Sequence, residues 1–460
     1  MAGPKPDQGA WSPDTMSPYQ YMVIALCFLA NVTDGFDVVS LALAAPVLSR
    51  EWTIDPAMMG ALFSAAAVGL TVGAFVVAPQ ADRIGRRPVM IGAVACLALT
   101  LTVTGLATAI WQLLVLRFVT GIALGTLVVC LNTTVAEYAS RERRNICLAV
   151  LHMGFTLGMI LGSGIAALVL ETIGWRSIFF AAGALNFVVF FGAIFLLGES
   201  PVFLATRRRP SDLLKLNRIG DRMRIPSLAE LVSPITQSAS EKAGGKMKLL
   251  LAGDLRQRTI LLWVASLTYA IVGYFLMNWK PTILNNAGLS PTLAAASGMI
   301  TGACGSLGHL AMGLWARKAG EGRLTAIFFA CAAVTLVIFG LQPPNPIFLL
   351  AMAGITTFFV VGAYTGIFLV TVIMYPPSVQ NTGMGFVVGF GRIGAIIGPM
   401  IGGFLLSAGF DRMATYFIFS AIAVIPAVTM HLANRIALRD LSSGGPAVGV
   451  SDDERAARAV

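Results

Sequence analysis

Two aspartates lie within the first long apolar stretch of the chain, where acidic side chains are unexpected. Asp34 and Asp37 fall in a run that extends from about 19 to 46, which exceeds the roughly 20 residues needed to cross a bilayer. A carboxylate near the middle of a membrane is unfavourable unless it is paired, hydrated or protonated. A spacing of three places both acids on one face of a helix. One aspartate at a helix end in contact with headgroup water is the alternative, but two acids at this depth favour a proton-carrying or substrate site.

Two arginines also lie well inside apolar stretches and supply cationic partners for these acids. Arg117 and Arg392 each carry a guanidinium, a planar fork of donors that matches a carboxylate. A substrate anion can displace an aspartate from such an arginine, and the released aspartate then takes up a proton. Because the two carboxyls would titrate as a coupled pair, we assign the proton to Asp34 and Asp37 together. For Arg392, a structural salt bridge is the alternative.

Twelve apolar spans position these residues. They run at about 19–46, 57–80, 87–107, 109–137, 145–171, 176–197, 257–284, 291–315, 323–342, 345–374, 380–408 and 412–436. The chain is 57% hydrophobic and 12% charged, whereas soluble domains carry roughly 25% charged residues. Its mean hydropathy is +0.80. We predict an all-α membrane protein with twelve transmembrane helices in two pseudo-symmetric halves of six.

Positive charge is distributed unequally between the two sets of loops. One set, together with the central segment, holds most of the basic residues, among them Arg83, Arg86, Arg87, Arg141, Arg143, Arg144, Arg317, Lys318 and Arg323. The other set keeps only Arg50, Arg176, Lys280 and Arg412. This asymmetry predicts that both termini lie in the cytoplasm. It also accounts for the net charge of +10 without nucleic acid as a partner.

The order of spans and loops predicts five parts. They are an N-terminal tail (1–18), a first six-helix half (19–197), a cytoplasmic central loop (198–256), a second half (257–436) and a C-terminal tail (437–460). Repeated halves around a midplane site are how many secondary transporters alternate their access. We expect a monomer in the inner (plasma) membrane.

Several motifs resemble those of one transporter family. The loop Asp82-Arg83-Ile84-Gly85-Arg86-Arg87 resembles the cytoplasmic loop motif of the major facilitator superfamily. The run Asp34-Gly35-Phe36-Asp37 is similar to the signature of its aromatic acid:proton symporter branch. Further matches are 117–125 in the fourth span, Gly198-Glu199-Ser200-Pro201 after the sixth, 279–282 in the seventh and 391–394 in the eleventh. The resemblance implies the major facilitator fold, with helices 1, 4, 7 and 10 around a central cavity.

The same loop motif suggests a gate. Asp82 at a helix end can accept hydrogen bonds from helix N-termini and pair with arginines. Glu137 and Arg141, at the inner end of the fourth span, would belong to the same latch, together with Arg83, Arg86 and Arg87. The alternative is that these arginines only set the orientation of the chain in the membrane. The second-half copy of the loop carries Arg317 where an aspartate would stand, so we expect the latch to depend on the first-half loop and its aspartate.

Aromatic and histidine side chains could form the walls for a ring-shaped substrate. The candidates for substrate contact are Phe36, Tyr274, Tyr364 and His309, beside Arg117 and Arg392. Ordinary core packing is the alternative for each of them. Trp279, at the end of the seventh span, fits an interfacial belt.

The charged residues predict a proton-coupled transporter of an organic anion, and the family resemblance implies a symporter that imports a small aromatic carboxylate of the benzoate or hydroxybenzoate type. The alternatives are a symporter for a non-aromatic organic anion, such as a dicarboxylate or sugar acid, a proton-driven exporter, and a transporter-like sensor. Its partners would be a small organic acid, protons and the bilayer. We find no metal-ligand spacing, nucleotide-binding motif or catalytic motif, so we predict no metal, no cofactor and no enzymatic activity.

Overall fold

The computed structural model describes residues 16–140, 142–207, 210–223, 247, 249–343, 345–376 and 379–442. Within these residues all regular structure is helical, which confirms the predicted all-α class. The chain divides into two compact units. Unit 1 comprises Met1–Ala44 and Ala65–Ala239, and unit 2 comprises Ala45–Ser64 and Ser240–Val460.

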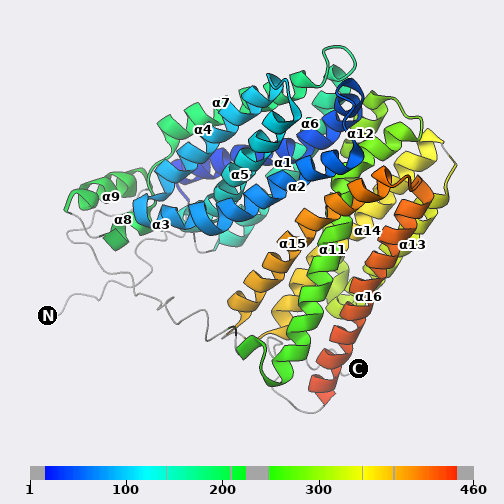
Figure 1. Cartoon of the computed structure of the whole chain (residues 1–460). Helices are drawn as coiled ribbons and strands as arrows, with labels where there is room; N and C mark the ends of the chain where they lie inside the picture. The colour runs from blue at the N-terminus through cyan, green and yellow to red at the C-terminus, as the bar shows by residue number, and fades with distance from the viewer. Residues whose placement is uncertain are drawn as a thin grey trace. The chain divides into compact units, whose positions relative to one another are not determined.

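Six long helices form the first part of the described chain (Figure 1). They are α1 (Pro18–Glu51), α2 (Pro56–Val72), α4 (Arg86–Gly105), α5 (Ile110–Tyr138), α6 (Arg144–Val169) and α7 (Arg176–Leu196). A π-helical turn (Gly73–Val77), a 3₁₀ turn (Ala78–Gln80) and the short α3 (Ala81–Ile84) join α2 to α4. Two shorter helices follow α7, namely α8 (Pro201–Arg207) and α9 (Pro210–Met223).

Six more long helices follow the central segment, of which residues 224–246 lie outside the described residues. They are α11 (Gly253–Asn286), α12 (Pro291–Ala319), α13 (Glu321–Leu341), α14 (Pro346–Met374), α15 (Gln380–Ser407) and α16 (Arg412–Ser442). In the described part of the chain, eleven helices are long and apolar enough to cross a membrane. The long helix missing from that set is α12, whose many glycine, serine and threonine residues lower its hydropathy.

Proline and short polar side chains define where several of these helices begin. Pro291 and Pro346 stand in the first turns of α12 and α14, where a missing N–H costs nothing. Ser290 and Asn345 precede them as N-caps, and each accepts a hydrogen bond from the first turn. Caps of this kind stabilise a helix by about 0.5–2 kcal/mol.

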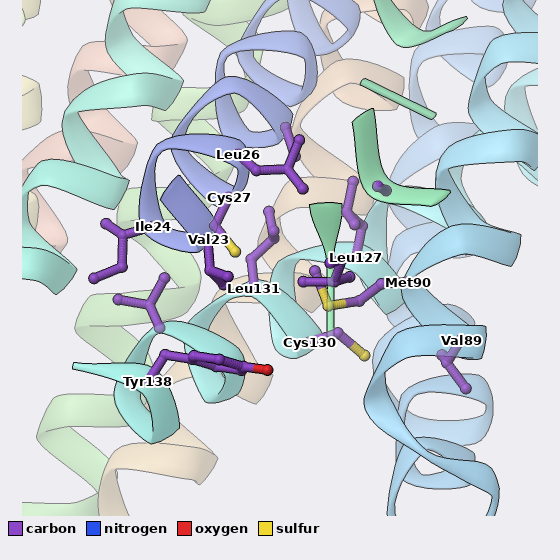
Figure 2. Packing of buried hydrophobic residues seen from close by; sticks show 14 of the residues in the cluster. Val23, Ile24, Leu26, Cys27, Val89, Met90, Leu127, Cys130, Leu131 and Tyr138 are labelled. Carbon is purple, nitrogen blue, oxygen red and sulfur yellow. The ribbon is translucent and has the colours of Figure 1, made fainter. Parts of the chain in front are cut away.

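Each unit has its own apolar core. In unit 1 the core joins α1, α4 and α5, and Figure 2 shows Cys27 from α1, Met90 from α4 and Leu131 from α5 turned toward one another. Cys130 also lies within this cluster, and all six cysteines of the chain are free thiols. In unit 2 a second cluster extends over the helices from α11 to α16.

Two predictions at the end of the seventh span are wrong. Trp279 does not lie in an interfacial belt, because its side chain is 1% exposed and its indole N–H donates to the Pro399 carbonyl at 2.9 Å. Lys280 is not a loop residue, because it lies inside α11 and is 8% exposed. The helix continues through Pro281 to Asn286, so both residues belong to the interior of unit 2.

Candidate functional site

A buried ion pair lies in the interior of unit 1. Arg117 Nη1 on α5 is 3.2 Å from Asp37 Oδ1 on α1, and each side chain is only 2% exposed. Ser40 donates a hydrogen bond to the same carboxylate oxygen at 3.3 Å. The Arg117 guanidinium also lies over the Phe179 ring, 5.3 Å from its centroid. The structure therefore brings together two of the four charges that the sequence singled out.

Close packing of α1 against α6 holds the aspartates in place. A methyl group on Gly35 would come within 2.0 Å of the Phe155 carbonyl oxygen, and one on Gly158 would come equally close to the Val32 carbonyl oxygen. These two glycines therefore let the helix backbones approach each other directly at the level of the acids. Asp34 is also buried, with 2% of its surface exposed. The glycine between the two acids is thus explained by helix packing.

Phe36 belongs to the same helix interface. Its ring is 1% exposed, and its Cδ2 atom would be 2.4 Å from a methyl group placed on Gly162 of α6. The side chain thus fills the contact between α1 and α6 in this structure.

The second arginine lies in unit 2 beside a group of tyrosines. Arg392 on α15 donates to the Tyr274 hydroxyl at 3.4 Å, and its side chain is half-buried. The rings of Tyr269 and Tyr364 stack with their centroids 5.0 Å apart, and Phe368 lies edge-on to Tyr364 at 4.8 Å.

These tyrosines and Arg392 form one cluster. Tyr364 interacts electrostatically with both Tyr274 and Arg392, and it is 39% exposed. We call Tyr269, Tyr274, Tyr364 and Arg392 the tyrosine cluster. It combines an accessible aromatic face with a guanidinium.

His309 lies on α12 and forms a hydrogen bond with the Thr365 hydroxyl of α14. Thr365 directly follows Tyr364, so the histidine is tied to the helix that carries the accessible tyrosine. Four predicted substrate residues thus lie in the same unit. They are Tyr274 on α11, His309 on α12, Tyr364 on α14 and Arg392 on α15.

The loop motif forms a network of ion pairs in unit 1. Arg86 contacts the Asp82 carboxylate at 2.9 Å and the Glu137 carboxylate at 2.9 Å. Glu137 also accepts a hydrogen bond from the Ser200 hydroxyl. The Asp82 side chain is 72% exposed, so its contact with Arg86 is weak on its own. Arg83 is exposed, and Arg141 lies outside the described residues.

The carboxylate that caps α4 is Glu199. Its Oε1 accepts hydrogen bonds from the backbone N–H groups of Arg86 and Arg87, at 2.8 and 3.1 Å. Gly85, between α3 and α4, has a φ of +116° and leaves room for this carboxylate. An anion at a helix N-terminus is stabilised by the helix dipole.

Sequence reasoning assigned no role to Glu199, Ser200, Phe179 or Lys280. For Glu199 a signal existed, because an acid in the turn after the sixth span stands at the membrane end shared with the motif loop. Nothing in the sequence indicated that Phe179 faces Arg117, since it is one of many phenylalanines in an apolar span.

The family model described as Major Facilitator Superfamily matches residues 27–375. The chain belongs to the major facilitator superfamily. It is therefore a multi-pass membrane protein of a transporter family rather than an enzyme. The resemblance drawn from the loop motif is confirmed.

Relatives of known specificity match almost the whole chain. The gallate transporter of Pseudomonas putida is 31% identical, over 91% of this chain and 92% of its own length. The 4-hydroxybenzoate transporter PcaK of Pseudomonas aeruginosa is 29% identical, over 90% and 93%. The benzoate transport protein of Acinetobacter baylyi is 26% identical, over 91% and 90%. The predicted aromatic acid branch is thereby confirmed.

Solved structures agree on the fold. A bacterial homologue of the human lysosomal transporter Spinster superposes with a TM-score of 0.74 at 18% identity, over 92% of this chain and 98% of the other. The nucleoside transporter NupG superposes with a TM-score of 0.69 at 13% identity, over 90% and 99%. The predicted major facilitator fold is confirmed.

Proposed function

We propose that this protein is a proton-coupled symporter that imports a small aromatic carboxylate by alternating access. It would lie in the inner (plasma) membrane with both termini in the cytoplasm, as the loop charges favour. The observation that carries the proposal is the Asp37–Arg117 pair, which is buried in a membrane-spanning helix bundle. Relatives that transport gallate, 4-hydroxybenzoate and benzoate support the substrate class.

The ion pair supplies the coupling. While Asp37 is ionised it neutralises Arg117, and a proton on Asp37 removes that charge and releases the guanidinium. Two nitrogens of Arg117, Nε and Nη2, are buried and have no hydrogen-bond partner among the described residues. An anion is the group that such a released and under-coordinated guanidinium attracts. Proton uptake by the Asp34/Asp37 pair and substrate binding therefore favour each other, which is the condition for symport.

The tyrosine cluster would recognise the substrate. Arg392 and the Tyr274 hydroxyl can both donate to an oxygen atom of the substrate, and the accessible Tyr364 ring can stack on the aromatic ring of the substrate. Such ring contacts contribute about 0.5–1.5 kcal/mol each beyond burial. A hydroxylated ring would gain a further hydrogen bond from a tyrosine hydroxyl. The tyrosine cluster is therefore our candidate for the contacts with the substrate ring.

The motif network would control the conformational change. Arg86 joins the loop carboxylate Asp82 to Glu137 at the end of α5, so a movement of the loop relative to α5 must break one of these contacts. Because Glu137, which accepts a hydrogen bond from Ser200, contacts Arg86 from the buried side, we assign Asp82 the exchangeable contact.

Uptake into proteoliposomes tests the proposal. With an inward proton gradient, radiolabelled 4-hydroxybenzoate, benzoate or gallate should accumulate, and a protonophore should abolish accumulation. Asp37→Asn should lose accumulation but keep exchange of internal for external substrate. The matched control is Asp221→Asn on α9, whose side chain is exposed.

A second variant tests recognition. Arg392→Lys keeps the charge but loses the fork, so affinity should fall by about 1–3 kcal/mol. Arg435→Lys, at an exposed position of α16, is its control. Accumulation of a dicarboxylate or sugar acid in place of every aromatic acid would contradict the substrate class. Efflux driven by proton entry would indicate an exporter, and binding without flux would indicate a sensor.

A further inference from the structure

A buried lysine in unit 2 lies apart from both groups described above. Lys280 is 8% exposed within α11, and its ammonium donates one hydrogen bond to the Thr357 hydroxyl of α14 at 3.2 Å. No carboxylate forms an ion pair with Lys280 among the residues that the structure describes. An ammonium without a counter-ion is costly in a membrane-spanning bundle.

The lysine lines a small cavity between helices of unit 2. The other lining residues are Leu276, Phe339, Ala353, Thr356, Thr357 and Tyr416. The cavity has a volume of about 10 Å³. That is room for one water molecule or one small ion. An organic acid with an aromatic ring is too large for it.

Three polar groups around this cavity, those of Lys280, Thr356 and Tyr416, have unused hydrogen-bond donors. The hydroxyls of Thr356 and Tyr416 are buried, at 2% and 1% exposure, and neither has a hydrogen-bond partner in the described structure. An ammonium has three N–H groups, of which the Thr357 contact uses one. Arg412, one turn before Tyr416, interacts electrostatically with that tyrosine and adds positive potential. Buried polar groups of this kind require partners.

We propose that Lys280, Thr356 and Tyr416 form a binding site for one small monovalent anion, with chloride as the physiological occupant. The anion accepts hydrogen bonds from the ammonium and from both hydroxyls, and it neutralises the buried charge. The site lies between α11, α13, α14 and α16, so it fixes the packing of unit 2. It goes beyond the transport activity, since none of its residues belongs to the tyrosine cluster or the Asp37–Arg117 pair.

Thermal unfolding of the detergent-purified protein in chloride and in gluconate, at equal ionic strength, provides the first test. A ligand that binds only the folded state raises the melting temperature, and we expect a rise of at least about 2 °C in chloride. Lys280→Met should abolish this difference, because it removes the charge at similar volume. Lys318→Met, at an exposed position, should keep it.

Two milder variants keep the test decisive if Lys280→Met does not fold. Tyr416→Phe and Thr356→Val each remove one donor with almost no change in shape, so several-fold more chloride should be needed for half of the stabilisation. Crystals soaked in bromide should show an anomalous peak beside Lys280 Nζ in the wild type. Equal melting temperatures in chloride and gluconate, together with no bromide peak, would mean that the cavity holds only water and would overturn the proposal.

Discussion

Removal of Arg117 should destabilise the protein far more than removal of the whole ion pair. At the 3.2 Å that separates Arg117 Nη1 from Asp37 Oδ1, the Coulomb attraction is about 5 kcal/mol in an effective dielectric of about 20. The desolvation of both ions offsets most of that attraction. Arg117→Met leaves the Asp37 carboxylate buried without its cation, and such a loss costs about 3–5 kcal/mol.

A double-mutant cycle measures this effect. Asp37→Asn/Arg117→Met replaces both ions by neutral side chains of similar size, so it should recover about 1–3 kcal/mol relative to Arg117→Met alone. The assay is equilibrium unfolding in mixed detergent micelles at neutral pH, with Arg435→Met as the exposed control. If Arg117→Met matched that control, and the effects of the two single variants were additive, the pair would not couple α1 to α5. Asp37 would then not be the proton site.

Three further predictions concern the packing and the loop network of unit 1. Gly35→Ala places a methyl group 2.0 Å from the Phe155 carbonyl oxygen, so it should lower the unfolding free energy by about 1–3 kcal/mol. The control Gly92→Ala should not destabilise the protein, because a methyl group there meets no other atom within 4 Å. Glu199→Ala removes the acceptor of two N–H groups at the start of α4 and should lower the unfolding free energy by about 0.5–2 kcal/mol, with the exposed Glu142→Ala as control. Asp82→Asn should change the unfolding free energy by less than about 1 kcal/mol, because the Asp82 side chain is largely exposed. Substrate turnover in vesicles should fall while substrate affinity stays unchanged. A loss of affinity instead would contradict the assignment of Asp82 to the gate.

The fold was predictable because lipid imposes a simple rule on the sequence. A chain must satisfy its backbone inside the membrane, so long apolar runs become helices, and the runs at 19–46 and 109–137 correspond to α1 and α5. The eighth span was also recognised, although α12 is less apolar than the others. Glycines such as Gly158 lower hydropathy but promote close helix packing.

The orientation of side chains around each helix was less predictable. A membrane helix is apolar on the side that faces lipid and on the side that faces the protein, so its sequence does not reveal which face is inside. For this reason the sequence placed Trp279 in a belt and Lys280 in a loop, although both are buried in α11. The partners of Arg117 were predictable only as a choice between two aspartates. The structure shows the contact with Asp37.

Charge pairs were easier to predict when the chain offered few candidates. Only a small number of acids and arginines lie deep in the apolar spans, so an ion pair between Arg117 and one of the first-helix aspartates was expected from the energetics of burial. The cap on α4 was missed, because Glu199 is distant in sequence from Arg86 and the turn that joins them spatially depends on the packing of α7 beside α4.

Proton movement driven by substrate alone is the most direct test of the proposed coupling. Proteoliposomes that enclose a pH-sensitive dye are equilibrated without any pH gradient, and 4-hydroxybenzoate, benzoate or gallate is then added outside, with the membrane potential clamped. We expect the lumen to acidify in vesicles with the wild type or Asp221→Asn. It should not acidify with Asp37→Asn, even though labelled substrate still exchanges. Proton coupling would be contradicted if substrate entered wild-type vesicles with no more acidification than in protein-free vesicles. It would also be contradicted if Asp37→Asn acidified the lumen as much as the wild type.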